Sequence, residues 1–176
     1  MKNEILNSIL SCGGLFCGGF VRDWLILGGE YNDIDFYFEG TIPEKFRSWK
    51  SNGRARVNVI DGVIFSLIIM NPYSDLSCNL FCFDGEKIFA RPTRVLFSYA
   101  KSWELIFDKK FVYTNETDIR CRIKMLEKGW TQDRIDTRQR AVVSSPLYGP
   151  WSDFTLAKER FDALALWHPL KVCNKS

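Results

Sequence analysis

Two aspartates, Asp33 and Asp35, stand one residue apart in the sequence, with the apolar Ile34 between them. On a β-strand the side chains at i and i+2 point to the same face, so this spacing would present two carboxylates together. Paired carboxylate oxygens suit Mg²⁺, which keeps several waters and binds substrate phosphates through one or two carboxylates. The spacing therefore predicts a site for Mg²⁺ or Mn²⁺, with Asp33 and Asp35 as metal ligands and catalytic residues.

A glycine pair, Gly18 and Gly19, lies upstream of the aspartates, between a brief apolar stretch and a helical pattern. Glycines let backbone N–H groups approach an anion closely, and the dipole at a helix N-terminus favours negative charge. A phosphate site beside a metal site is the arrangement of phosphoryl- and nucleotidyl-transfer enzymes. The two features together predict that class of chemistry.

The elements that must position these residues follow from apolar periodicity and turn signals. The expected helices cover residues 3–12, 21–27, 43–50, 93–107, 116–128 and 153–166. The expected strands cover residues 15–17, 33–38, 56–60, 63–70, 79–83 and 87–89, with hairpin turns at Asp61-Gly62 and Asp84-Gly85. This order predicts an α/β (α+β) fold in which a small mixed sheet with flanking helices is followed by a short helical neck.

Composition excludes several classes of protein. A chain of 176 residues that is 46% hydrophobic is expected to form one domain, with at most a small appendage. Six cysteines without a C-x-x-C pair, and a single histidine, leave little for a zinc site and favour reduced thiols. The N-terminus lacks the layout of a signal peptide, and the apolar run at 63–70 is far short of the roughly 20 residues that span a membrane. We therefore expect a cytoplasmic protein in a reducing compartment, without a membrane partner.

Charge is distributed unevenly along the chain. Residues 1–90 carry 8 basic and 11 acidic side chains, residues 91–140 carry 12 and 7, and residues 141–176 carry 4 and 3. A basic segment after an acidic one suits contact with a nucleic-acid backbone, but a solvated helix face explains it equally well. The candidate RNA contacts on the expected helix 116–128 are Arg120, Arg122, Lys124 and Lys128.

The stretch from Gly18 to Asp35 carries a family resemblance. It reads Gly-Gly-Phe-Val-Arg-Asp-Trp-Leu, then a glycine-containing bend, then Asp-Ile-Asp. This resembles the Gly-Gly-x-Val-Arg-Asp-x-Leu-Leu and Asp-x-Asp pattern of template-independent nucleotidyltransferase head domains. The family comprises CCA-adding enzymes and bacterial poly(A) polymerases of the DNA polymerase β superfamily. Weaker matches follow at residues 75–80, 83–85 and 92–96.

The resemblance implies transfer of a nucleoside monophosphate from an NTP, such as ATP, to an RNA 3′-hydroxyl, as in tRNA processing or polyadenylation. It implies that Asp33 and Asp35 bind two magnesium ions, one at the attacking hydroxyl and one at the triphosphate. Asp23, beside the glycine turn, is interpreted as mainly structural. The residues that the resemblance assigns to nucleotide binding are Gly18, Gly19, Arg22, Asp75, Asn79 and Arg94.

The chain departs from the family pattern at a third carboxylate. Family members carry it on the strand after the aspartate pair, and the corresponding position here is Ser66. Asp61, in the preceding turn, is the nearby acid that could act as a third metal ligand. A second departure is Ser74, where the family usually has arginine. The alternative to an enzyme is therefore a catalytically degenerate relative that binds nucleotide, RNA or a partner protein.

The expected organisation has three segments. Residues 1–90 form the catalytic head, residues 91–140 a basic helical neck, and residues 141–176 a C-terminal extension. For the extension, docking on the head and a flexible tail both stay open. Because the family's long tRNA-binding body is missing, we expect a minimal enzyme or a subunit of a larger assembly. Transfer to a protein or small-molecule hydroxyl is a further alternative.

Overall fold

The computed structural model describes residues 2–69, 76–91, 98–113, 117–134 and 147–166. The helices are α1 (Lys2–Ser11), η1 (Phe20–Ile26), α2 (Glu44–Arg47), η2 (Ser77–Asn79), α3 (Tyr99–Phe107), α4 (Ile119–Glu127), η3 (Pro150–Asp153) and α5 (Thr155–Leu166). The strands are β1 (Leu15–Cys17), β2 (Asp33–Tyr37), β3 (Lys50–Asn52), β4 (Ala55–Ile60), β5 (Val63–Ile68), β6 (Phe81–Phe83), β7 (Ile88–Ala90), β8 (Lys110–Tyr113) and β9 (Thr131–Arg134).

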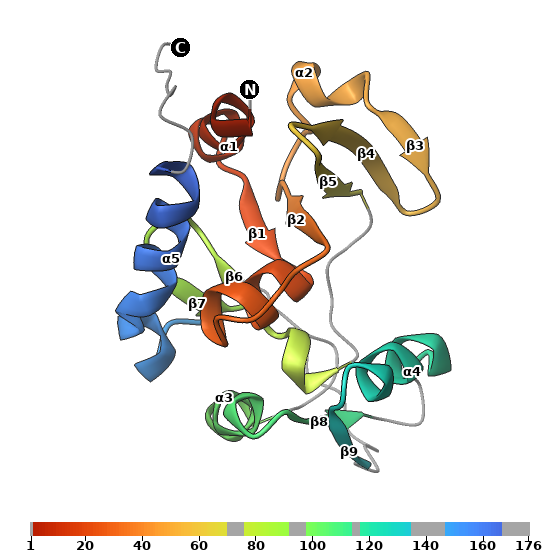
Figure 1. Ribbon diagram of the computed structural model, residues 1–176, viewed down its shortest axis with the longest axis vertical. Helices are drawn as coiled ribbons and strands as arrows, with labels where there is room; N and C mark the ends of the chain where they lie inside the picture. Colours follow the sequence, from red (N-terminus) through yellow and green to blue (C-terminus); the bar gives the residue numbers. More distant parts are fainter. Residues whose placement is uncertain (1, 70–75, 92–97, 114–116, 135–146, 167–176) are drawn as a thin grey trace. The chain divides into compact units, whose positions relative to one another are not determined.

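Seven strands form one mixed sheet in the order β3-β4-β5-β2-β1-β6-β7 (Figure 1). β2 and β5 are parallel, while β1 pairs antiparallel with both β2 and β6. The expected α/β (α+β) fold with a mixed sheet and flanking helices is therefore confirmed. The aspartate strand β2 lies near the middle of the sheet, between β1 and β5.

One face of the sheet forms the core. The side chains that the central strands direct to this face are fully buried: Phe16, Ile34, Phe36, Phe65 and Leu67. The ring of Phe36 packs edge-on against Phe46 of α2 and against Trp49, with centroids 5.5 and 5.8 Å away. Because residues alternate along a strand, committing this face to the core leaves the other face to Asp33 and Asp35.

The chain divides into two compact units that do not follow the three expected segments. The first contains residues 1–72, 82–88 and 154–176, and the second contains residues 73–81 and 89–153. Helix α5 thus belongs to the unit that contains the aspartates, although it lies near the end of the sequence.

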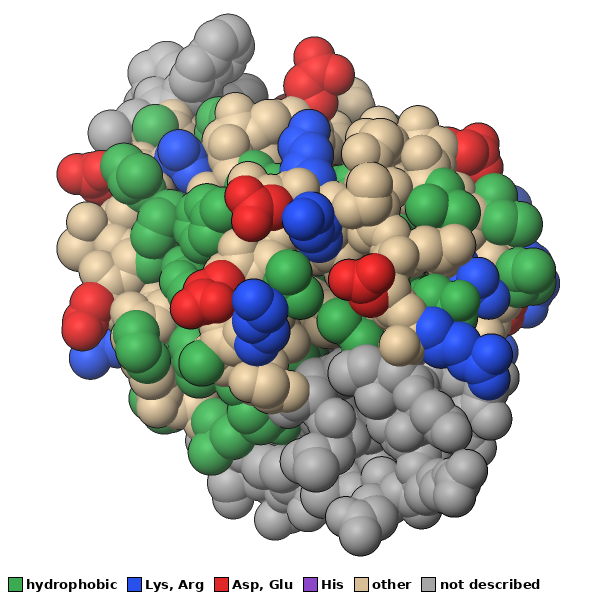
Figure 2. Space-filling view, turned by 90° about the horizontal axis from the view of Figure 1, so that it is seen from below, with side chains coloured by type: hydrophobic (Ala, Val, Ile, Leu, Met, Phe, Trp, Pro, Cys, Tyr) green, Lys and Arg blue, Asp and Glu red, His purple; other side chains and the backbone are tan. Residues whose placement is uncertain are grey.

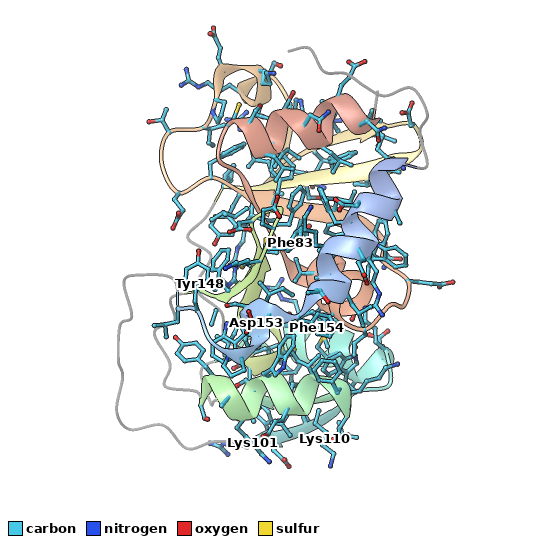
Figure 3. The ribbon with its side chains drawn as sticks, turned by 90° about the vertical axis from the view of Figure 1, so that its left-hand side faces the viewer. Phe83, Lys101, Lys110, Tyr148, Asp153 and Phe154 are labelled. Carbon is cyan, nitrogen blue, oxygen red and sulfur yellow. The ribbon has the colours of Figure 1, made fainter. Side chains whose placement is uncertain are left out.

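Helix α5 packs closely within the first unit. Its Phe161 contacts the rings of Phe16 and Phe83, at centroid distances of 5.2 and 5.3 Å; Figure 3 labels Phe83 beside the helix. The guanidinium of Arg160 donates to the carbonyls of Leu25 and Ile26, at 2.9 and 2.8 Å. Both carbonyls lie at the C-terminal end of η1, where a helix leaves acceptors without internal partners. Of the two arrangements left open for this segment, α5 shows the docked one, packed within the first unit.

In the second unit, α4 connects the two strands of a small parallel pair along the sequence. β8 and β9 pair in register from Lys110 with Thr131 to Tyr113 with Arg134. The Asp118 carboxylate caps α4 by accepting from the Arg120 N–H at 2.9 Å. The second unit also contains α3, η2 and η3, and its fully buried residues include Ile106 of α3 and Phe111 of β8.

Three strands differ from the sequence expectations. The helix expected over 43–50 is limited to Glu44–Arg47, and Lys50–Asn52 forms β3 instead. Gly53, with φ +62°, begins the two-residue turn that pairs β3 with β4. The polar Lys-Ser-Asn sequence has no apolar alternation, so only the Asn-Gly step signalled this hairpin. β8 and β9, which pair with each other, were also not expected.

Three further observations bear on the sequence analysis. The hairpin turn at Asp61-Gly62 is confirmed, with φ +53° and +76°. The five cysteines in the described part of the chain are free thiols. Within these residues, no helix is both long and apolar enough to cross a bilayer.

We predict that Phe161→Ala lowers the free energy of unfolding by about 3–5 kcal/mol, because it empties a site between two buried aromatic rings. Leu156→Ala is the matched control, since Leu156 lies on the same helix but is 45% exposed, and should cost well under half as much. Urea unfolding measures both values. Equal losses would contradict the docking of α5 through Phe161.

Candidate functional site

The candidate site is built on the alternation of side chains along β2. Ile34 and Phe36 are fully buried on the core face, whereas Asp33 and Asp35 are half-buried on the other face. The two carboxylates therefore share one face of the sheet, as their spacing predicted. Two side chains with hard oxygen donors and partial access to water are thus held on a rigid central strand.

Gly18 lies directly beside Asp35. The antiparallel register pairs Cys17 with Asp35, so the chain leaves β1 next to this carboxylate. Gly18 has φ +66°, which favours glycine, and a Cβ at this position would overlap the Asp35 Oδ2 atom. Only glycine therefore fits both the backbone turn and the side chain that rests against it.

The helix after the glycines is wider than the expected α-helix. Phe20–Ile26 is a π-helix, and the Leu27 N–H donates to the Arg22 carbonyl at 3.2 Å, five residues back. The Gly29 N–H reaches the Asp23 carbonyl at 2.6 Å. Short π-helical turns are uncommon and occur frequently at functional sites, where they displace side chains from regular helical positions. Sequence periodicity does not distinguish them from α-helix.

Arg22 is engaged by its neighbour in the sequence. Its Nε and Nη2 atoms donate to the two carboxylate oxygens of Asp23, each at 2.8 Å, and the pair is largely buried. Removing Asp23 would leave a buried guanidinium without this partner, which is costly. The geometry agrees with the structural interpretation of Asp23. It also means that Arg22, expected at the nucleotide, has a charge partner within the protein.

Ser66 takes part in the aspartate site. The parallel register places Ser66 next to Asp35 on β5, and its hydroxyl donates to Asp33 Oδ2 at 3.1 Å. A small neutral side chain thus lies where the family resemblance would put a third carboxylate. The Ser66 hydroxyl orients one oxygen of Asp33 but adds no negative charge.

Asp61 does not join the pair. Its carboxylate accepts from the backbone N–H of Lys2 at 2.7 Å, at the start of α1. Burial lowers the pKa of the Lys2 amine, and the nearby charge of Asp61 partly offsets that effect. Among the described residues, no group of three or more His, Cys, Asp or Glu side chains is arranged to hold a metal ion. Within the described residues Asp61 is therefore not a third ligand here, and Asp33 and Asp35 are the two carboxylates on this face of β2.

The donor set nevertheless fits a hard divalent cation. Mg²⁺ is commonly bound by one or two carboxylates, with water and substrate phosphates completing its coordination. Asp33 and Asp35 provide two such carboxylates on the face opposite the core. Thiolate or imidazole donors, which softer metals prefer, are not part of this pair.

The structure does not test the other predicted nucleotide contacts as part of this site. Asn79 is in the second unit, in η2, where its N–H donates to the Leu76 carbonyl at 3.1 Å. Asp75 and Arg94 lie outside the described residues. The fold therefore brings Gly18, Gly19 and the two aspartates together in the first unit.

The basic residues of α4 are only partly available to RNA. Arg120 pairs with Asp118 at 2.8 Å, and Arg122 donates to Gln132 and stacks 3.7 Å from the Tyr113 ring centroid. Exposed aliphatic side chains share the helix with them: Ile119, Ile123 and Leu126. Seen from below, hydrophobic and basic side chains lie next to one another on the surface (Figure 2). Lys124 of α4 and Lys128, the residue that follows the helix, are exposed.

We predict that Gly18→Ala destabilises the protein more than Gly53→Ala does. Both glycines have φ above +60°, so both variants carry the same backbone penalty, but only Gly18 would meet a neighbouring side chain. The extra loss at Gly18 should be about 1–3 kcal/mol, the usual cost of overpacking. Chemical denaturation measures the difference. Adding Asp35→Ser to Gly18→Ala should recover part of the extra loss of stability. Equal losses for Gly18→Ala and Gly53→Ala would contradict the close fit.

Comparisons of the chain with protein-family models, with curated proteins and with solved structures gave no match. Function is therefore inferred from the geometry around Asp33 and Asp35.

Proposed function

We propose that this protein is a metal-dependent nucleotidyltransferase that moves a nucleoside monophosphate from an NTP to a hydroxyl acceptor. The acceptor that the family resemblance implies is an RNA 3′ end. One observation carries the proposal: the Asp35 carboxylate rests against the positive-φ Gly18, with Asp33 on the same face two residues away. A glycine turn at a helix start and a carboxylate pair are the two parts that this chemistry needs.

The proposed roles follow from the positions of the groups. Asp33 and Asp35 would hold Mg²⁺ or Mn²⁺, and Ser66 would orient Asp33 through the bond to its Oδ2. The metal, when bound, neutralises phosphate charge and lowers the pKa of a coordinated hydroxyl. Gly18 and Gly19 would bring backbone N–H groups close to the triphosphate.

The transfer step balances without a further reactant. The acceptor oxygen forms a bond to the α-phosphorus of the NTP, and the bond between that phosphorus and the α–β bridging oxygen breaks. The bridging oxygen leaves with its electron pair as part of pyrophosphate, and the hydroxyl proton passes to water. Attacking and leaving oxygens lie roughly in line in such displacements.

A second candidate is a catalytically degenerate relative that binds nucleotide, RNA or a partner protein. Two observations favour it: Ser66 supplies a hydroxyl where a third carboxylate is expected, and Arg22 is paired with Asp23. Loss of one anionic group beside the reacting oxygens can cost several kcal/mol of transition-state stabilisation. The two candidates differ in whether the wild-type protein turns over.

We predict that Asp33→Asn and Asp35→Asn each reduce nucleotide incorporation at least ~100-fold, because each removes a charge that stabilises the transferring phosphoryl group. Asp61→Asn is the matched control, since it also removes one carboxylate from this unit but not from the pair, and should keep activity within about twofold. The assay supplies each radiolabelled NTP with mixed RNA and tRNA, in Mg²⁺ or Mn²⁺.

The controls separate the two candidates. Incorporation by the wild type and by Asp61→Asn, but not by Asp33→Asn or Asp35→Asn, supports the enzyme. Wild-type activity in Asp33→Asn or in Asp35→Asn would refute the mechanism. No incorporation by a folded wild-type protein that still binds nucleotide would establish the degenerate relative.

A further inference from the structure

The open face of the sheet continues from the aspartates into an aliphatic surface. Ile64 is the register partner of Asp33 on β5, and Val59 is the partner of Ile64 on β4. Ile64 is 40% exposed and Val59 is 60% exposed, so two neighbouring strands present aliphatic side chains to solvent. Strands β2, β5 and β4 lie side by side in that order (Figure 1), so this surface begins directly beside the carboxylates.

A second row on the same face ends in a positive charge. Asp35 pairs with Ser66, Ser66 with Val57, and Val57 with Lys50 on β3. Three strand spacings of about 4.8 Å place Lys50 roughly 14 Å from Asp35. Lys50 is exposed, and it is the only cation that these four strands direct to this face, since Arg56 is a partner of the buried Leu67 on the core side.

The direction of the reaction assigns this surface to one substrate. If the protein has the proposed function, the glycine turn holds the triphosphate on the β1 side of the Asp33 and Asp35 carboxylates, next to Asp35. In-line displacement then brings the attacking hydroxyl from the opposite side, over β5. A group attached to that hydroxyl would lie on Ile64 and Val59.

We propose that Val59 and Ile64 seat the 3′-terminal nucleoside of an RNA acceptor and that Lys50 binds one phosphate upstream of it. This inference rests on the proposed function and adds its acceptor subsite. An unpaired base offers an apolar face that packs on apolar side chains. Because Lys50 is the only cation that β2, β3, β4 and β5 direct to this face, these strands would hold the acceptor by its terminal nucleoside rather than along its backbone.

The first readout is steady-state kinetics with a short single-stranded RNA acceptor. Val59→Ser and Ile64→Ser should raise the KM for RNA about fivefold, from the loss of buried apolar area, while the KM for NTP stays unchanged. Ile69→Ser is the matched control, because Ile69 is 39% exposed but follows β5 on the alternate face. Lys50→Gln should reduce the slope of log KM against log salt by about 0.7, the value for one phosphate contact on a single strand. Lys101→Gln, which changes an exposed lysine of α3, should leave that slope unchanged.

The second readout is fluorescence anisotropy of a 5′-fluorescein-labelled RNA oligonucleotide without NTP, which does not depend on turnover. Weaker binding by Val59→Ser, Ile64→Ser and Lys50→Gln, but not by the two controls, supports the acceptor seat even if the wild type incorporates nothing and the proposed function fails. Equal RNA binding and equal KM across all variants would overturn the inference. Transfer of label to a protein, with none to RNA, would also overturn it.

Discussion

The site depends on one close fit, that of the Asp35 carboxylate against the bare backbone of Gly18. The register of β1 and β2 makes this fit unavoidable, because it pairs Cys17 with Asp35 and leaves Gly18 as the next residue. Any side chain at residue 18 would displace the carboxylate. The same glycine turns the chain from a buried strand into the helix η1. Backbone N–H groups and negative charge are thereby assembled by a local turn and a single strand pairing.

The rest of the first unit keeps that pairing rigid. Core packing through Ile34 and Phe36 fixes the face on which the aspartates lie, because a shift of one residue would exchange the two faces. Helix α5, distant in the sequence, supports η1 by donating from Arg160 to its last carbonyls. A preorganised site needs such support from elements that do not touch the substrate.

The strands next to the site could be predicted from the sequence because their apolar alternation and turn dipeptides are strong. β1 and the Asp61-Gly62 hairpin are clear examples. Other features depend on partners that one sequence segment does not reveal. β3 is stabilised by pairing with β4 rather than by its own polar residues, and the seven residues of η1 are too few for apolar periodicity to separate a π-helix from an α-helix. Likewise, nothing near Asp61 in the sequence shows that it meets Lys2 instead of the aspartate pair.

The proposed function requires that Asp33 and Asp35 together bind a divalent cation beside Gly18. The most direct measurement is amide NMR of the protein titrated with Mn²⁺, whose unpaired electrons broaden nearby signals. We predict the strongest broadening at residues 17–19, 33–35 and 64–66, reversal by excess Mg²⁺, and loss of the pattern in the Asp33→Asn/Asp35→Asn double variant. Broadening that is strongest elsewhere, or that survives the double substitution, would contradict it.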